Sequence, residues 1–321
     1  MHSIHKIPSI LRMPSIPQIP STPQIPSTPQ IPPILKIPSI LKIPLVALSF
    51  SLFALSCSDT IADSDPGNND PQDPPEKELQ LVWSDEFETD ELDPSKWSYQ
   101  YGTGQDEGLH GWGNNELQYY TDREDNIYIK DDMLHIVARE ERLEGMDYTS
   151  ARIRTLDKGD WKYGRFEIRA KLPEGQGIWP AIWMLPTDER FGGWPKSGEI
   201  DIMEMVGHEP ETIHGTVHYG PDWPENQFTG SSYTLDDGTF SDDFHVFSIE
   251  WEEDHIAWFV DGEQYFEVTP NHLSPHRYPF NERFHLLINL AVGGNWPGSP
   301  DATTEFPQTL IVDYVRVYQY K

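Results

Sequence analysis

A period-two alternation of apolar and polar residues recurs along the chain from about residue 79 to its end. In residues 165–172, Phe, Ile, Ala and Leu alternate with Arg, Glu, Arg and Lys, and residues 134–139 and 247–252 show a similar pattern. This alternation puts apolar side chains on one face of a half-buried strand. Asp261-Gly262, between two further strand-like runs, predicts a tight hairpin. Because no amphipathic helix longer than a couple of turns can be found, the sequence predicts an all-β sandwich or barrel.

The first 78 residues have a different character. Residues 1–44 repeat short Ile-Pro units, and proline removes a backbone donor and disfavours helix before it, so this stretch is excluded from the fold. A short apolar run from Pro44, preceded by lysines, is typical of a secretory signal and too short to span a bilayer; a buried strand or helix is the alternative. We therefore expect an N-terminal extension with its signal (1–56), a disordered acidic linker (57–78) and one folded domain (79–321).

Cys57 is the only cysteine, so no intrachain disulfide can form. Ala54-Leu55-Ser56-Cys57 resembles a bacterial lipobox, which implies cleavage before Cys57 and lipidation of its thiol. Ala54 stands where leucine is usual, so free secretion remains the alternative. We expect an exported protein, either an outer-membrane lipoprotein on the cell surface or a secreted one, touching a membrane only through that anchor.

The charge of the chain bears on its partners. The formal net charge is −30, and because the first 56 residues hold four basic residues and no acid, the remainder carries −34. Such a surface repels nucleic acid and anionic polymers at low salt. This favours a neutral substrate and no nucleic-acid partner, although a surface suited to salty surroundings explains the charge equally well.

Three acids in six residues form the most informative segment, Ser197 to Glu204. Glu199 and Asp201 share one strand face, and the isoleucines between and after them share the other. Glu204 breaks this parity, and a regular strand would turn its charge into the core at great cost. A β-bulge at Ile202-Met203 would return it to the acidic face, and two glutamates there can approach to the roughly 5–5.5 Å that a retaining glycosidase requires. A solvated acidic face or a metal site is the alternative.

Together with six other segments, this strand resembles family 16 of the glycoside hydrolases in its bulged, laminarinase-like form. The resemblance covers about residues 80–320. The supporting segments, in order, are WSDEF at 83–87, GWGNNELQYYT at 111–121, YTSARI at 148–153, GIWPAIWMLP at 177–186, HGTVHYG at 214–220 and LLINLAVGGNWPG at 286–298.

The resemblance implies a β-jelly-roll of two curved antiparallel sheets with a concave substrate cleft. It implies that Glu199 is the nucleophile, Glu204 the general acid/base and Asp201 an auxiliary residue that tunes the nucleophile. We expect no cofactor for catalysis and a monomer. The expected sugar-binding residues are Asn114, Arg152, Trp179, Trp194, His218, Asn289 and Trp296, whereas Trp183 is expected in the core. A structural Ca²⁺ is implied at Glu86, Asp313 and the backbone near Asp132, since oxygen ligands suit that ion.

The predicted activity is that of a retaining endo-β-1,3-glucanase acting on laminarin-like β-glucan. A mixed-linkage β-1,3-1,4-glucanase is the first alternative. A catalytically silent glucan-binding lectin on the same scaffold is the second, and the presence of both glutamates disfavours it.

Overall fold

The structure is a computed structural model and describes residues 78–321. The Pro-rich extension, the export signal, Cys57 and the predicted linker up to residue 77 lie outside the described residues. Within residues 78–321, no helix has the length and apolarity needed to cross a bilayer.

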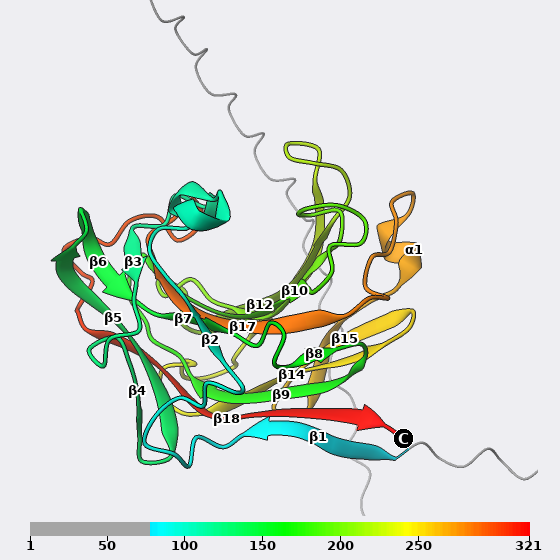
Figure 1. Ribbon diagram of the computed structural model, residues 1–321, viewed down its shortest axis with the longest axis horizontal. Helices are drawn as coiled ribbons and strands as arrows, with labels where there is room; N and C mark the ends of the chain where they lie inside the picture. The colour runs from blue at the N-terminus through cyan, green and yellow to red at the C-terminus, as the bar shows by residue number, and fades with distance from the viewer. Residues whose placement is uncertain (1–77) are drawn as a thin grey trace, which may run out of the picture. The chain divides into compact units, whose positions relative to one another are not determined.

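Two stacked sheets make up the described residues, as Figure 1 shows. Their strands pair antiparallel, except for the parallel pair β3 and β6. One sheet has ten strands, in the order β16-β15-β14-β9-β18-β5-β6-β3, with β1 beside β18 and β4 beside β5; these strands are β1 (Leu79–Asp85), β3 (Gln118–Tyr120), β4 (Ile127–Lys130), β5 (Met133–Leu143), β6 (Met146–Ser150), β9 (Gly164–Lys171), β14 (His245–Glu252), β15 (His255–Val260), β16 (Glu263–Val268) and β18 (Gln308–Tyr320).

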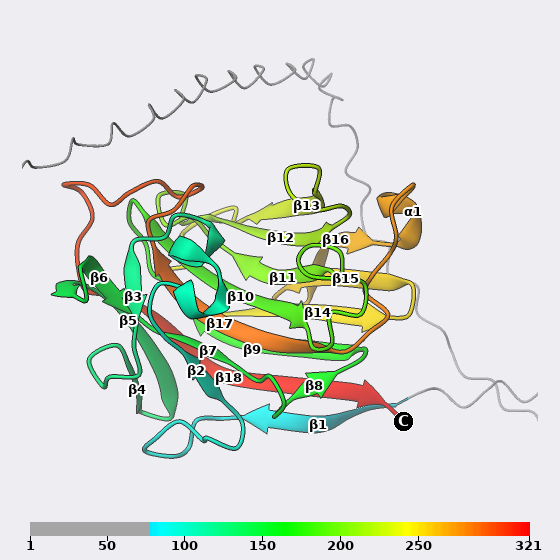
Figure 2. The same cartoon turned by 45° about the horizontal axis from the view of Figure 1, so that its top comes forward.

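The other sheet has eight strands, in the order β13-β12-β11-β10-β17-β7-β2, with β8 beside β17. Figure 2 shows β13, β12, β11, β10 and β17 following one another in this layer. We call its face away from the ten-stranded sheet the open face; Figure 1 shows that it is concave. The strands are β2 (Ser98–Gln100), β7 (Arg152–Arg154), β8 (Asp160–Trp161), β10 (Ile178–Pro186), β11 (Glu199–Glu204), β12 (Thr212–Tyr219), β13 (Gln227–Thr234) and β17 (Phe284–Val292).

The alternating sequence patterns account for the strands of the ten-stranded sheet. In β9 the buried and half-buried residues alternate along the whole strand, as predicted for residues 165–172. The hairpin predicted at Asp261-Gly262 is confirmed: it joins β15 to β16, and both residues have positive φ, 51° and 84°. Helical segments are short, as expected: η1 (Gln105–Glu107), η2 (His110–Gly113) and α1 (Pro270–Leu273).

Aromatic and branched aliphatic side chains fill the space between the sheets. Trp251 and Trp258 of the ten-stranded sheet are fully buried there. Each also places its indole N–H on a backbone carbonyl: Trp251 Nε1 lies 2.8 Å from the oxygen of Phe280, and Trp258 Nε1 lies 2.8 Å from that of Asp201. The bond from Trp258 therefore anchors β11, the strand that carries the acids, to the core between the sheets. The predicted all-β jelly-roll sandwich is confirmed.

Candidate active site

The bulge predicted in β11 is confirmed by its pairing with both neighbours. On β12, the partners of Glu199, Asp201 and Glu204 are His218, Thr216 and His214, so three residues of β11 oppose two of β12 after Asp201. On β10, Ile182 and Trp183 are consecutive, yet they pair with Met203 and Asp201. The extra residue is therefore Ile202, and the three acids share the open face.

The bulge keeps the apolar residues of β11 inside. Ile200, Ile202 and Met203 are at most 2% exposed and belong to the core between the sheets. Without the extra residue, Glu204 and Met203 would exchange faces, which would bury a charge and expose a thioether. The local fold of this strand is thus set by burial of three apolar side chains.

His218 lies over two of the acids. Its Nε2 atom is 3.3 Å from Asp201 Oδ2 and 3.6 Å from Glu199 Oε1. Across residues 78–321, Glu199, Asp201 and His218 are the only set of three potential metal ligands whose ligand atoms all lie within 4.8 Å of one another. The same crowding suits proton sharing, because neighbouring carboxyl groups disfavour a second negative charge.

Burial dominates the titration of all three acids. It raises the pKa of Glu199 to about 8, with further raising by Asp201, and lowering by His218 and Arg152. It raises the pKa of Glu204 to about 8, with further raising by Asp201, and lowering by His218 and by a hydrogen bond from Trp179. The pKa of Asp201, only 2% exposed, is raised well above its ordinary value by burial alone. The arrangement therefore holds protons near neutral pH, as acid–base chemistry requires.

Each glutamate also accepts a hydrogen bond from an indole. Trp194 Nε1 lies 3.1 Å from Glu199 Oε2, and Trp179 Nε1 lies 3.1 Å from Glu204 Oε1. Trp296 does not reach a carboxyl group but stands edge-on to Trp179, with ring centroids 5.7 Å apart. Of the residues expected to bind sugar, Trp179, Trp194 and His218 thus contact the acids directly. Trp296 instead packs against Trp179.

Arg152 is buried beside this group, between two tryptophan rings. Its guanidinium carbon is 4.4 Å from the ring centroid of Trp112 and 4.7 Å from that of Trp183. Its Nε donates to the side chain of Gln100 at 2.6 Å. A cation held in this way has little freedom to move, so it acts as a fixed charge that favours ionisation of Glu199.

The expectation that Trp183 belongs to the core is wrong. Trp183 pairs with Asp201, and its indole N–H donates to Asn289 Oδ1 at 2.8 Å on the open face. β10 pairs with β17 without a register shift, so regular alternation puts Trp183 on the same face as Trp179, four residues before it. Asn289 is consequently buried under Trp183, whereas Asn114 is exposed and its backbone carbonyl binds the amide of Asn295.

Glu116 was not anticipated. It is 6% exposed, and its Oε2 accepts bonds from Gln118 Nε2 at 2.6 Å and Tyr120 hydroxyl at 3.2 Å. Burial raises its pKa, against the lowering by Arg152. The signal in the sequence was the period-two spacing of Glu116, Gln118 and Tyr120, which puts three polar groups on one side of an extended segment that includes β3.

The residues expected to hold calcium do not fit that ion. Glu86 forms two hydrogen bonds with Arg316, at 2.9 and 2.7 Å, and Asp313 pairs with Arg169 at 2.5 Å. Both carboxylates are thus neutralised by arginines of the same sheet. Asp132 lies in the turn after β4 with a φ of 56°. A calcium site needs several free oxygen ligands, so no role is assigned to the ion.

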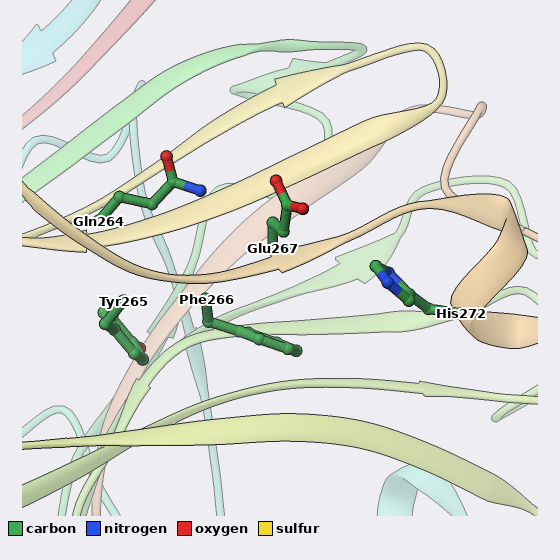
Figure 3. A pocket seen from close by; sticks show the side chains of 5 residues that line it. All are labelled: Gln264, Tyr265, Phe266, Glu267 and His272. Carbon is green, nitrogen blue, oxygen red and sulfur yellow. The ribbon is translucent and has the colours of Figure 1, made fainter.

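One hollow among the described residues lies away from the acids. It measures about 480 Å³ and flanks the edge strand β16 of the ten-stranded sheet. Figure 3 shows Tyr265 and Phe266 on one side of that strand and Gln264 and Glu267 on the other, with His272 facing them. The chemistry resides instead on the open face of the eight-stranded sheet, because only there do buried acids with raised pKa values converge.

Replacing Asp201 with asparagine is expected to stabilise the protein at alkaline pH. The folded state holds a proton on Asp201 at pH values where the unfolded chain has released it, so stability is lost as pH rises through the raised folded pKa. An asparagine side chain has no such proton to lose. Thermal unfolding should show a flatter dependence of Tm on pH between about 5 and 8 and a higher Tm at pH 8, by about 2–4 °C per kcal/mol gained. Asp254→Asn, at an exposed turn, controls for the lost charge, and parallel pH curves for Asp201→Asn and wild type would contradict the argument.

Comparison with known proteins places this geometry in a family. The model of glycosyl hydrolases family 16 matches residues 112–315. A glucan endo-1,3-beta-glucosidase A1 from Niallia circulans is 45% identical over 270 residues, and a beta-glucanase from Rhodothermus marinus is 48% identical over 253 residues. The matches cover 78% and 75% of this chain, and 39% and 85% of those relatives; the chain thus spans well under half of the first.

A solved structure agrees with the same placement. The laminarinase catalytic domain from Thermotoga maritima MSB8 superposes with a TM-score of 0.72 at 48% sequence identity. The superposition covers 76% of this chain and 99% of that one. The similarity therefore extends over nearly the whole of that domain.

Proposed function

Because the chain belongs to glycosyl hydrolases family 16, we propose that it is a laminarinase, an endo-β-1,3-glucanase that retains anomeric configuration. The observation that carries this is the bulged strand β11, which turns Glu199, Asp201 and Glu204 to one face. Support for the substrate comes from the Niallia circulans relative and the Thermotoga maritima laminarinase, both named for β-1,3-glucan or laminarin cleavage.

Burial raises the pKa of both glutamates to about 8, and in this proposal the reactive state is the one in which Glu199 is ionised while Asp201 and Glu204 are protonated. Glu199 has the surroundings that favour a negative charge: the Trp194 N–H, His218 and Arg152. Burial raises the pKa of Asp201 well above its ordinary value, so Asp201 keeps its proton and does not compete with Glu199 for charge. Glu204 is also protonated near neutral pH and serves as the acid.

The reaction is a double displacement. Glu199 attacks the anomeric carbon while Glu204 gives its proton to the glycosidic oxygen, so a glycosyl–ester bond forms and the bond to the leaving sugar breaks. Water then attacks the same carbon, Glu204 takes a proton from it, and the ester bond breaks. Two inversions return the β configuration. The mechanism predicts a carboxyl separation of about 5–5.5 Å between the glutamates.

The substrate assignment is tested with four polysaccharides: laminarin, lichenan, agarose and κ-carrageenan. We expect release of oligosaccharides from laminarin at a rate at least tenfold above that from lichenan, and none from the two galactans. The strongly acidic chain should repel sulfated κ-carrageenan. Mixed-linkage specificity is not favoured by the relatives above, and faster cleavage of lichenan than laminarin would support it. Cleavage of agarose alone would exclude a glucanase.

A glucan-binding protein without catalysis is a weaker alternative. Binding requires no pair of buried carboxyl groups with indole donors, and burying them opposes ionisation. Catalysis needs this pair of carboxyl groups on the bulged strand, whereas binding does not.

Export completes the proposal. A polymeric substrate lies outside the cell, which agrees with the signal and the lipobox-like segment predicted before Cys57. We propose a monomeric enzyme that is either anchored through lipidated Cys57 or freely secreted. Mass spectrometry of the mature N-terminus distinguishes the two forms.

A further inference from the structure

The two catalytic glutamates are bound by two different indole groups. Trp194 belongs to the loop before β11 and donates to Glu199; Trp179 belongs to β10 and donates to Glu204 Oε1. An indole N–H donates and never accepts, so Oε1 of Glu204 is fixed as an acceptor. The proton of the neutral acid then rests on the other oxygen, Oε2.

We propose that Trp179 is a positioning residue that assigns the two oxygens of Glu204, holding Oε1 as a permanent acceptor and leaving Oε2 to exchange the proton. This role rests on the proposed function and adds to it, because it states which atom performs the acid–base step. It differs from the sugar-stacking role expected from the sequence, which would use the face of the ring and not its N–H.

The orientation of Trp179 is fixed from several sides. A Cβ atom at Gly294 would lie 3.1 Å from Cζ3 of the indole, so the backbone of the β17–β18 loop packs closely against the ring. That loop is tied down by a hydrogen bond from the amide of Gly293 to the carbonyl of Gly177, at 2.7 Å. The ring of Trp296 meets Trp179 edge-on, at an interplanar angle of 88°.

Trp296 is in turn packed against β12, the strand that pairs with β11 at Glu204. His214 is the direct cross-strand partner of Glu204, and its ring stands 5.0 Å from that of Trp296, again edge-on. Burial lowers the pKa of His214, so its imidazole is neutral and adds no charge beside the acid. The contacts thus run from Glu204 to Trp179, Trp296 and His214 and back to Glu204. Within this group, only the Trp179 N–H contacts the carboxyl group.

Trp179→Phe tests the proposal, because it keeps an aromatic ring and removes the N–H. On laminarin, whose leaving sugar needs a proton, kcat/KM should fall about tenfold or more. On an aryl β-laminaribioside with a dinitrophenyl leaving group, which needs no proton, kcat/KM should change less than about threefold. Since the lost bond favoured the ionised form, the alkaline limb of the kcat/KM profile on laminarin should move to higher pH.

Trp194→Phe is the matched comparison. It makes the same change beside the nucleophile, which acts on every substrate, so its losses on laminarin and on the aryl glycoside should agree within about threefold. Trp296→Ala removes the brace and keeps the Trp179 N–H, so it should reproduce the leaving-group dependence in weaker form. Trp223→Phe, at a tryptophan that is 76% exposed, should match wild type. Tm values of all variants show whether each one is folded.

The outcomes distinguish failure of the positioning role of Trp179 from failure of the proposed glucanase activity. If wild type cleaves laminarin but Trp179→Phe loses equal activity on both substrates with an unmoved alkaline limb, Trp179 is a sugar platform and the positioning role is overturned. The same holds if the folded variant loses nothing. If wild type cleaves neither substrate, the glucanase proposal itself fails.

Discussion

Replacing Glu199 with alanine is expected to lower kcat on laminarin by on the order of 10⁵-fold, because no other residue can form the glycosyl–enzyme bond. The loss should be comparable on aryl glycosides, since a good leaving group does not replace a nucleophile. Binding of laminarin should persist, because His218 keeps its contact with Asp201 and Arg152 keeps its place between Trp112 and Trp183. Isothermal titration with laminari-oligosaccharides and a sensitive reducing-sugar assay measure the two quantities.

Azide gives this variant a distinctive product. The anion fits the space of the missing carboxylate and attacks the anomeric carbon from the same side, in a single displacement. With an aryl β-laminaribioside the product should therefore be the α-glycosyl azide, of inverted configuration, identified by NMR. A folded Glu199→Ala protein with wild-type activity would mean that another residue is the nucleophile.

The sequence predicted the fold because local patterns and global burial agree. In β9, for example, the alternation of apolar and charged residues directly shows which face is buried. The bulge in β11 was also predictable, because a regular strand would bury the charge of Glu204 and one extra residue returns it to the open face. In both cases the structure follows from the burial of apolar side chains, and their positions can be read from the sequence of a single strand.

The contacts between strands could not be predicted in the same way. The bond of Trp183 to Asn289 joins residues 106 positions apart, and it appears only once β10 and β17 lie side by side. The pairing of Glu86 with Arg316 joins residues 230 positions apart, and it engages a carboxylate that the family resemblance implied as a calcium ligand. Likewise, Trp179 was expected to stack on sugar, and its bond to Glu204 appears only once β10 and β11 lie side by side.

The complementary variant is Glu204→Ala, whose expected effect depends on the substrate. General acid catalysis contributes on the order of 10²- to 10⁴-fold, so kcat/KM on laminarin should fall by about 10³-fold. On a dinitrophenyl β-laminaribioside the fall should stay below about tenfold, because that leaving group departs without a proton. The alkaline limb of the wild-type profile should vanish as well. In wild type, activity falls as pH rises above about 8, because burial raises the pKa of Glu204 to about 8, and above that pH the acid has lost its proton.

Azide again reports the role, now with the opposite stereochemistry. In Glu204→Ala the glycosyl–enzyme still forms on Glu199, but water lacks the base that activates it. Azide needs no base, so it should accelerate turnover of the aryl glycoside and yield the β-glycosyl azide, of retained configuration. Glu204→Gln serves as the isosteric control, since it keeps the acceptor for Trp179 and lacks the transferable proton. An α-azide from Glu204→Ala together with a β-azide from Glu199→Ala would exchange the two roles, because configuration records which carboxyl group held the sugar.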